Sequence, residues 1–203
     1  MPNDNEQIFK PIFGDSWNYL PKSIIKHYSN RQFTNDTTTV EGKLDVMCKW
    51  FLKPFFYAFN AIPPYEQKDV FVTVNFKSSK DSKHFHLDRV FYFKNKQPFY
   101  FKSKMIQVKD NEVMEVMSGG ICWHLYYIWD GKKVILKHKG YSFKFLKFQI
   151  PLPITWLIGA GNAPEIPIDD NSFYMSATIH HWLFGKVYEY KGHFKFTKEV
   201  FEN

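Results

Sequence analysis

The stretch Val70-Phe71-Val72-Thr73-Val74-Asn75-Phe76-Lys77 decides the fold class of this chain. All four of its even positions are apolar, whereas three of its four odd positions are polar. Successive side chains of a β-strand point to opposite faces of the sheet, so this alternation is typical of a half-buried strand. The sequence therefore predicts that β structure occupies the chain from about Val70 onward.

The same alternation recurs after this stretch, with turn residues between the runs. Asp130-Gly131 is the strongest of these turns, because Asp-Gly between two alternating runs favours a hairpin. A proline-rich stretch, Pro151 to Pro167, reads as a loop. The further strands are expected at about 83–94, 99–108, 112–117, 121–129, 133–139, 172–181 and 186–197. The chain is therefore expected to be mostly β (α+β), with a large curved antiparallel sheet or a partly closed barrel.

Two helices are expected before the sheet. The first covers Ser16 to Ser29, where Pro21 suits a first helical turn and apolar residues follow at helical spacing. The second covers about Asp45 to Asn60, with an apolar stripe and a proline that kinks or ends it. Asn30 to Thr39 reads as a turn. A single domain over residues 1–203 is expected, with a helical part at about 16–60 and a β part at about 67–198.

The composition is that of a globular chain with an unusual aromatic content. Of 203 residues, 44% are hydrophobic and 23% are charged, which excludes a disordered protein. Aromatic residues make up 20% of the chain, with 22 Phe and 12 Tyr. Aromatic side chains bury much apolar area each. Their number fits either a thick packed core or an aromatic-lined cavity.

The formal net charge of +7 favours anionic partners. Lysines are densest between residues 132 and 147, a segment without acidic residues: Lys132, Lys133, Lys137, Lys139, Lys144 and Lys147. This run is either a solvated face or a face that contacts anions or a membrane. Nucleic-acid binding is disfavoured, since no RNP-like sequence is present and the lysines are spread over many elements.

The sequence predicts no disulfide, metal centre, cofactor or transmembrane segment. Cys48 and Cys122 are isolated thiols without metal-type spacing, and they suit a reducing compartment. The N-terminus is polar and lacks an apolar signal core. The longest apolar stretch, 148–164, is too short and too interrupted by Pro and Gly to span a bilayer as a helix. A cytoplasmic location is expected.

Arg89 and Glu115 are the sharpest candidates for a buried polar site. Arg89 occupies an otherwise apolar row of its strand, and Glu115 lies between Val113 and Met117 in the same way. A permanently charged guanidinium in such a row needs a partner. We therefore predict that the two residues meet across the strand between theirs. The pair specifies the fold, forms the polar end of a ligand pocket, or acts as a catalytic pair.

The histidines give weaker signals. His84 and His86 share one strand face, opposite to Arg89, but a metal site needs a third ligand that the sequence does not show. His181 follows the apolar row of its strand and is expected to face inward, with His180 outward. It either anchors a loop or bonds a ligand. His27 ends the first helix, where bonding to terminal carbonyls explains it.

The order of several short motifs resembles a known bacterial family over about Phe13 to Phe196. The motifs are Leu20-Pro21 with His27, Val40-Glu41-Gly42, the strand 86–91, Phe101-Lys102-Ser103, Glu115 with Gly119, 150–153, 179–185 and Tyr190-Lys191-Gly192. The family is a domain of unknown function, number 4166. The chain departs from it at Trp182, where the family tends to have proline, and at His86 and Leu87, where it tends to have an aromatic residue.

The resemblance implies an accessory or ligand-handling role, because family members occur alone or joined to a nicotinamide-cofactor-binding, reductase-like domain. This chain has no G-x-G-x-x-G after a strand and no nucleophile motif, so no reaction is assigned. The leading hypothesis is binding of an apolar, lipid-like ligand inside the sheet; the alternative is an accessory domain or subunit of a separate reductase-like protein. The candidate ligand-binding residues are Arg89, Glu115, His181, Tyr190 and Trp123.

Overall fold

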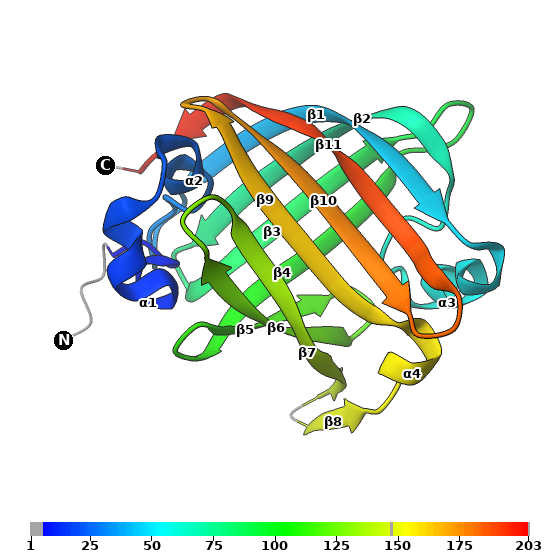
Figure 1. The fold of residues 1–203 in the computed structure, drawn as a ribbon. Coiled ribbons are helices and arrows are strands. Elements are labelled where there is room, and N and C mark those ends of the chain that lie inside the picture. Colours follow the sequence, from blue (N-terminus) through cyan, green and yellow to red (C-terminus); the bar gives the residue numbers. More distant parts are fainter. Residues whose placement is uncertain (1–5, 147, 203) are drawn as a thin grey trace.

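The computed structural model describes residues 6–146 and 148–202, which contain a single eleven-stranded antiparallel sheet. Its strand order is β6-β5-β4-β3-β2-β1-β11-β10-β9-β7-β8, and β6 also pairs with β7. This last pairing closes the sheet into a barrel, with β8 attached outside the ring. The sequence left open whether the sheet closes; the structure shows that it does (Figure 1).

Most strands join sequence neighbours through short turns, so the barrel is largely a meander (Figure 1). The strands of the first half are β1 (Thr37–Cys48), β2 (Gln67–Ser79), β3 (Ser82–Tyr92), β4 (Phe99–Lys109), β5 (Glu112–Met117) and β6 (Ile121–Trp129). Those of the second half are β7 (Val134–Phe145), β8 (Phe148–Leu152), β9 (Ala160–Asp169), β10 (Ser172–His181) and β11 (Gly185–Val200).

Short helices lie at the two ends of the barrel (Figure 1). One end carries α1 (Lys10–Phe13), the 3-10 segment η1 (Gly14–Tyr19) and α2 (Lys22–His27). The other end carries the 3-10 segment η2 (Trp50–Leu52), α3 (Lys53–Phe59) and α4 (Thr155–Ile158), with β8 beside them. The described residues contain no helix long and apolar enough to cross a membrane.

Aromatic rings fill the end of the barrel beneath α1 and α2. Phe9 packs on Tyr28, Phe85 and Tyr127 with ring centroids 4.4 to 5.1 Å apart. Each of these rings is buried. Edge and tilted contacts between rings add to the burial of apolar area. Aromatic side chains therefore form a packed core at this end of the barrel, which is the first of the two interpretations of the aromatic content.

The prediction for the segment Asp45 to Asn60 was wrong in its first part. Thr37–Cys48 is strand β1, so the turn expected over Asn30–Thr39 ends at Asp36 and the helix start at Asp45 is wrong, and α3 begins only at Lys53. Leu44, Val46 and Cys48 are buried in alternation with exposed or half-buried neighbours. The strand lies between β2 and β11. Pairing on both sides overrides the helical spacing of the apolar residues that follow.

Two further expectations are corrected. The stretch Pro151 to Pro167 is not a loop, because it holds the end of β8, α4 and most of β9. The helix expected over Ser16–Ser29 is divided, since extended backbone at Leu20 and Pro21 separates η1 from α2. Strands β2 to β6, β10 and β11 lie where the alternation places them, and β10 has the predicted bounds. Strand β7 continues beyond the expected 133–139 to Phe145, and β8 was not predicted. Within the described residues, no helix interrupts β2 to β7.

Candidate ligand-binding interior

Arg89 and Glu115 meet inside the barrel, as predicted. Nη2 of Arg89 donates to Oε1 of Glu115 at 2.8 Å, and the residues are only 6% and 4% exposed. Ser103, on the intervening strand β4, completes the group. Its hydroxyl donates to Oε1 of Glu115 at 2.6 Å and accepts from Nη1 of Arg89 at 3.2 Å. The strands β3, β4 and β5 thus supply one residue each.

This group is neutral overall and held on several sides. The Arg89 guanidinium lies over the Phe101 ring at 4.2 Å from its centroid. Burial is the largest single effect and lowers the Arg89 pKa, but the Glu115 carboxylate together with Tyr190 and Tyr127 outweighs it, so the Arg89 pKa is raised. The hydrogen bonds that Glu115 accepts from Arg89 and from Ser103 both go to its Oε1 atom. The second oxygen, Oε2, takes part in neither bond.

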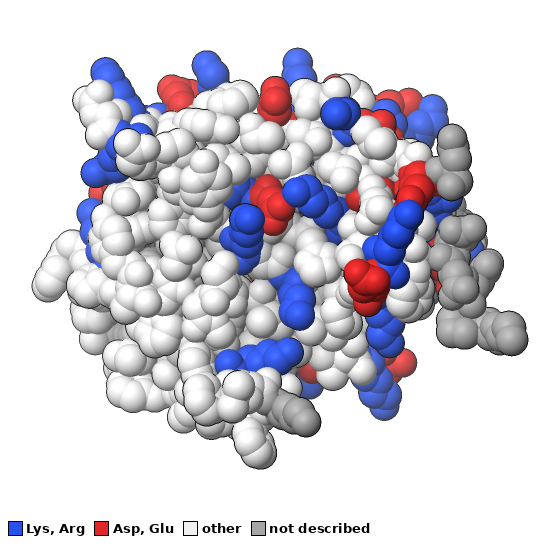
Figure 2. All heavy atoms as spheres, turned by 180° about the vertical axis from the view of Figure 1, so that it is seen from behind, with Lys and Arg blue, Asp and Glu red and all other residues white. Residues whose placement is uncertain are grey.

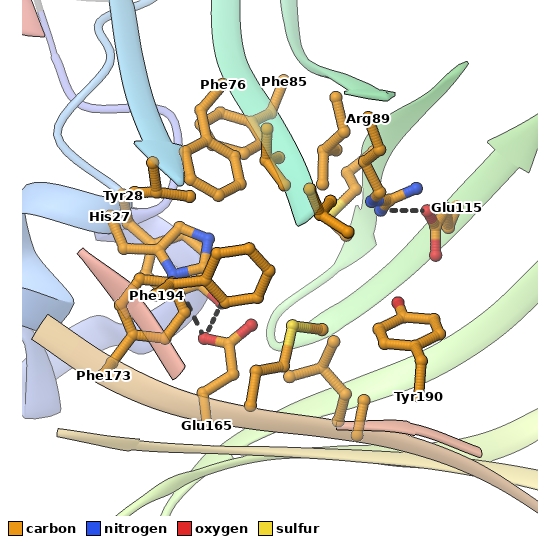
Figure 3. Close-up of a pocket in the computed structure, with 18 of the residues that line it drawn as sticks. His27, Tyr28, Phe76, Phe85, Arg89, Glu115, Glu165, Phe173, Tyr190 and Phe194 are labelled. Carbon is orange, nitrogen blue, oxygen red and sulfur yellow. Dashed lines mark hydrogen bonds and ion pairs between the residues drawn. The ribbon is translucent and has the colours of Figure 1, made fainter. Parts of the chain in front are cut away.

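Two cavities lie next to this group. One, of about 40 Å³, extends toward α2; the other, of about 70 Å³, extends toward α3 and α4. Glu115, Trp123 and Tyr190 line both of them. In Figure 3 the Tyr190 hydroxyl points toward the Arg89–Glu115 pair. Four of the five residues predicted to bind a ligand, all except His181, therefore lie together on the barrel interior.

Trp123 has a fixed orientation between the cavities. Its indole nitrogen donates to Nδ1 of His138 at 2.9 Å, and Nε2 of His138 lies 3.1 Å from Oγ1 of Thr155. The ring also lies against Gly161, where a Cβ atom would come within 2.9 Å of the indole. A side chain at position 161 would displace the ring, so glycine is required for this packing.

A second buried polar group lies at the α2 end of the first cavity. Tyr28 donates its hydroxyl to Oε2 of Glu165 at 2.6 Å, and Nδ1 of His27 lies 3.4 Å from the same oxygen. The His27 ring stacks on Tyr28 with centroids 4.2 Å apart. Figure 3 shows Glu165 reaching from its strand toward both residues, across the cavity from Arg89.

Burial determines the charge states of this second group. It raises the pKa of Glu165 to about 7, against the opposing effects of the Tyr28 bond and of Arg89. It lowers the pKa of His27 to about 3, and Arg89 adds to that decrease. The imidazole is therefore neutral at neutral pH. The approach of His27 to Glu165 is a contact between a neutral ring and a partly protonated carboxyl, not an ion pair.

His181 is buried and His180 is exposed, as the row of apolar residues predicted. His181 lies at the end of β10, away from both interior cavities. Its Nδ1 accepts the backbone N–H groups of Leu183 at 3.0 Å and Phe184 at 3.3 Å. These contacts anchor the β10–β11 turn, which is one of the two roles left open by the sequence.

The sequence did not identify Glu165, Tyr28 or His27 as interior polar residues. Glu165 lies in the same inward-facing row of β9 as Gly161 and Ala163, and less buried residues alternate with this row. The neighbouring prolines concealed that alternation, because proline is uncommon within strands. For His27 no signal was available, since a helix end explains the residue equally well. Within residues 6–146 and 148–202, no cluster of three His, Cys, Asp or Glu residues could hold a metal, and His84 and His86 belong to none.

Comparisons with known proteins agree with the resemblance noted in the sequence. The sequence model of the family described as "Domain of unknown function (DUF4166)" matches residues 20–194. Comparison with curated protein sequences yields no match. Among solved structures, the ywiB protein from Bacillus subtilis aligns with a TM-score of 0.28 and 10% identity, over 82% of this chain and 95% of that one. The dehydratase domain of the polyketide PpsC from Mycobacterium tuberculosis aligns with a TM-score of 0.20 and 4% identity, over 87% and 80%.

Proposed function

Because the chain belongs to the DUF4166 family, whose description assigns no activity, we propose a function from the barrel interior: it binds an apolar or lipid-like molecule. The observation that carries this proposal is the position of Glu115, Trp123 and Tyr190 on both cavities. Concave, mostly apolar sites with a few convergent polar groups are the usual form of small-molecule sites. The bound group would lie beside Trp123, with its polar end toward Tyr190 and Oε2 of Glu115.

The charges of the interior favour a neutral ligand. Glu115 already neutralises Arg89, so an added anion would meet no uncompensated cation there. A second buried charge costs several kcal/mol unless it is paired. A hydroxyl or carbonyl group can instead bond to the Tyr190 hydroxyl. The expected ligand class is therefore an apolar molecule with one neutral hydrogen-bonding group.

The volumes restrict the part of the ligand that enters. Each cavity, of about 40 or 70 Å³, is smaller than the engineered cavity of about 150 Å³ that holds benzene. The end of an alkyl chain fits such a space, whereas a six-membered ring would require the Trp123 side chain between the cavities to move. A longer lipid would extend past α3 and α4.

Native mass spectrometry of gently purified protein, followed by titration with cyclohexanol and 1-hexanol, tests the proposal. A retained adduct, or a stabilisation of about 2–3 kcal/mol at a hundredfold excess over Kd, is expected for the alcohols. Hexanoate is expected to stabilise much less, because it brings a charge. A clean apo mass together with no thermal shift by any of the alcohols would refute ligand binding.

A cavity-filling variant locates the binding. Ala177 lines the second cavity, and Ala177→Leu is expected to abolish the thermal shift. Ala58 is exposed on α3, so Ala58→Leu adds the same side chain outside the cavity and is the matched control. An unchanged shift in Ala177→Leu would place the alcohol elsewhere.

The alternative, an accessory role beside a separate reductase-like protein, is supported by family membership only. Co-purification of a tagged full chain with a nicotinamide-dependent reductase from the native host would support it. Recovery of the chain without such a protein would count against it.

A further inference from the structure

Large apolar side chains are exposed together at the barrel end that carries α3, α4 and β8. Trp50, Trp182 and Phe148 are 78%, 75% and 70% exposed. Monomeric proteins rarely expose large contiguous apolar patches without an interaction that uses them. We define the apolar rim as Trp50, Leu146, Phe148, Trp156, Trp182 and Phe184, all of which are exposed.

Contacts join three of the four separate segments that supply the rim. Phe184 packs on Phe51 at 5.1 Å between ring centroids, and Phe51 packs on Trp50 at 5.9 Å. The Trp182 indole donates to the backbone oxygen of Trp156 at 3.1 Å. The β7–β8 hairpin has Leu146 and Phe148 at its tip. It precedes α4 in the sequence and projects from the barrel beside it (Figure 1).

The segments that carry the rim bear charges of one sign. Residues 49–65, 144–159 and 180–187 contain no Asp or Glu. They carry Lys49 and Lys144, both exposed, and Lys186, which pairs with Glu189 of β11 at 2.8 Å. Figure 2, turned by 180° from Figure 1, shows a broad uncharged area at the lower left of the molecule, with Lys or Arg side chains at its border. Acidic side chains gather toward the upper and right parts of that view.

The lysines between residues 132 and 147 lie in two different places, the barrel wall and the β7–β8 hairpin. Lys139 pairs with Glu112 at 2.6 Å on the barrel wall, which is the solvated-face alternative. Lys144 lies one residue before the exposed Phe145 at the hairpin tip, beside the rim. Lys147 lies outside the described residues.

From these observations we propose that the apolar rim docks the protein on an anionic lipid membrane surface. Tryptophans suit the boundary between headgroups and acyl chains, where their rings are part apolar and part polar. Lysines at the border add attraction to anionic headgroups. Several separate insertions of large side chains, rather than one spanning segment, make this a peripheral contact.

The apolar rim lies next to the second cavity of the barrel interior. Phe55, Phe56 and Ile158 of α3 and α4 line the second cavity, whereas Trp156 of α4 belongs to the rim. The same two helices thus cover the cavity and border the docking surface. An apolar molecule leaving the bilayer would meet this end of the barrel first. The docking proposal itself rests on the surface residues and stands if the cavities bind nothing.

Flotation with lipid vesicles tests the docking. The full chain is expected to bind vesicles of phosphatidylcholine with roughly one third phosphatidylglycerol more strongly than pure phosphatidylcholine, and less as salt rises. Leu146→Ser with Phe148→Ser, and separately Trp156→Ser with Trp182→Ser, are each expected to lower the partition coefficient about tenfold or more. Brominated lipids should quench the wild-type tryptophan fluorescence.

Matched controls lie elsewhere on the surface. Tyr19 and Ile168 are exposed at the opposite end of the barrel, which carries α1 and α2, and Tyr19→Ser with Ile168→Ser is expected to leave partitioning unchanged. Each variant is used only if its circular dichroism spectrum matches that of the wild type. Because the two double variants lie on different elements, the test remains possible if one of them fails to fold. Absence of vesicle binding by the wild type, or equal binding by both rim variants, would overturn the proposal. Concentration-dependent dimerisation that the rim variants abolish, without vesicle binding, would assign the rim to a second copy of this chain and also overturn it.

Discussion

Arg89 on β3 and Glu115 on β5 form a 2.8 Å buried ion pair across β4, and Ser103 of that intervening strand bonds to both. The strands on which the pair stands are not neighbours, so neither residue could reach the other if the sheet were flat and the side chains short. The inward face of a curved barrel and the long arginine side chain bring the charges together.

Glu115→Ala is expected to destabilise the protein by about 3–5 kcal/mol, because it leaves the Arg89 charge buried without its partner. Replacing both residues, Arg89→Met with Glu115→Leu, should cost far less. Chemical denaturation measures both. Asp88→Ala is the control: Asp88 pairs with Lys77 on the outer surface, partly exposed, and its loss should cost at most about 1 kcal/mol. An unchanged stability of Glu115→Ala would contradict the importance of the pair.

Glu165 and His27 should have opposite effects on the pH dependence of stability. The folded-state pKa of Glu165 is raised to about 7 from 4.5, so the folded protein holds this proton between those values and the unfolded chain does not. Its contribution to stability therefore falls as pH rises from about 4.5 to 7. The pKa of His27 is lowered to about 3 from 6.5, so its contribution rises as pH rises from about 3 to 6.5.

In the overlap, between about pH 4.5 and 6.5, the two slopes should largely cancel. Glu165→Gln keeps an acceptor for Tyr28 but removes the titration, so its stability should rise with pH across this window, by about 1 kcal/mol per unit. His27→Gln should show the opposite slope. Urea unfolding of the three proteins at half-unit pH steps measures this. Parallel curves for wild type and Glu165→Gln would contradict the raised pKa of Glu165.

Gly119→Ala is expected to destabilise by about 1–3 kcal/mol through overpacking. A Cβ atom at Gly119 would overlap the backbone oxygen of Phe59, so the β5–β6 turn and the end of α3 would have to separate. Gly140→Ala is the matched control, since no heavy atom lies within 4 Å of its Cβ position. Thermal unfolding compares the two variants, and equal melting temperatures would contradict the close contact.

His181→Ala should cost about 1 kcal/mol, because two backbone N–H groups of the β10–β11 turn lose their acceptor. His181→Asn places an amide oxygen near the position of Nδ1 and should restore part of the stability. Thermal unfolding provides the measure. If His181→Asn restores stability but weakens binding of 1-hexanol, His181 takes part in ligand binding as well as in anchoring the turn.

The sequence determined those features of this protein that depend on local patterns. Alternation from Val70 onward specifies the strands, and Arg89 and Glu115 in apolar rows require a buried partner, because an isolated buried charge is too costly. The same patterns gave the membership of the family, which the match over residues 20–194 confirms.

Only the tertiary structure decided the features that depend on contacts distant in sequence. Pairing with β2 and β11 makes Thr37–Cys48 a strand, although the residues after it have helical spacing. Pairing of β6 with β7 closes the ring, which turns one sheet face into an enclosed interior. That closure buries Glu165 beside His27, 138 positions away in the sequence, and so sets the pKa of both. Local periodicity carries no information on such encounters, because the free energy that fixes them arises only when the distant strands pair.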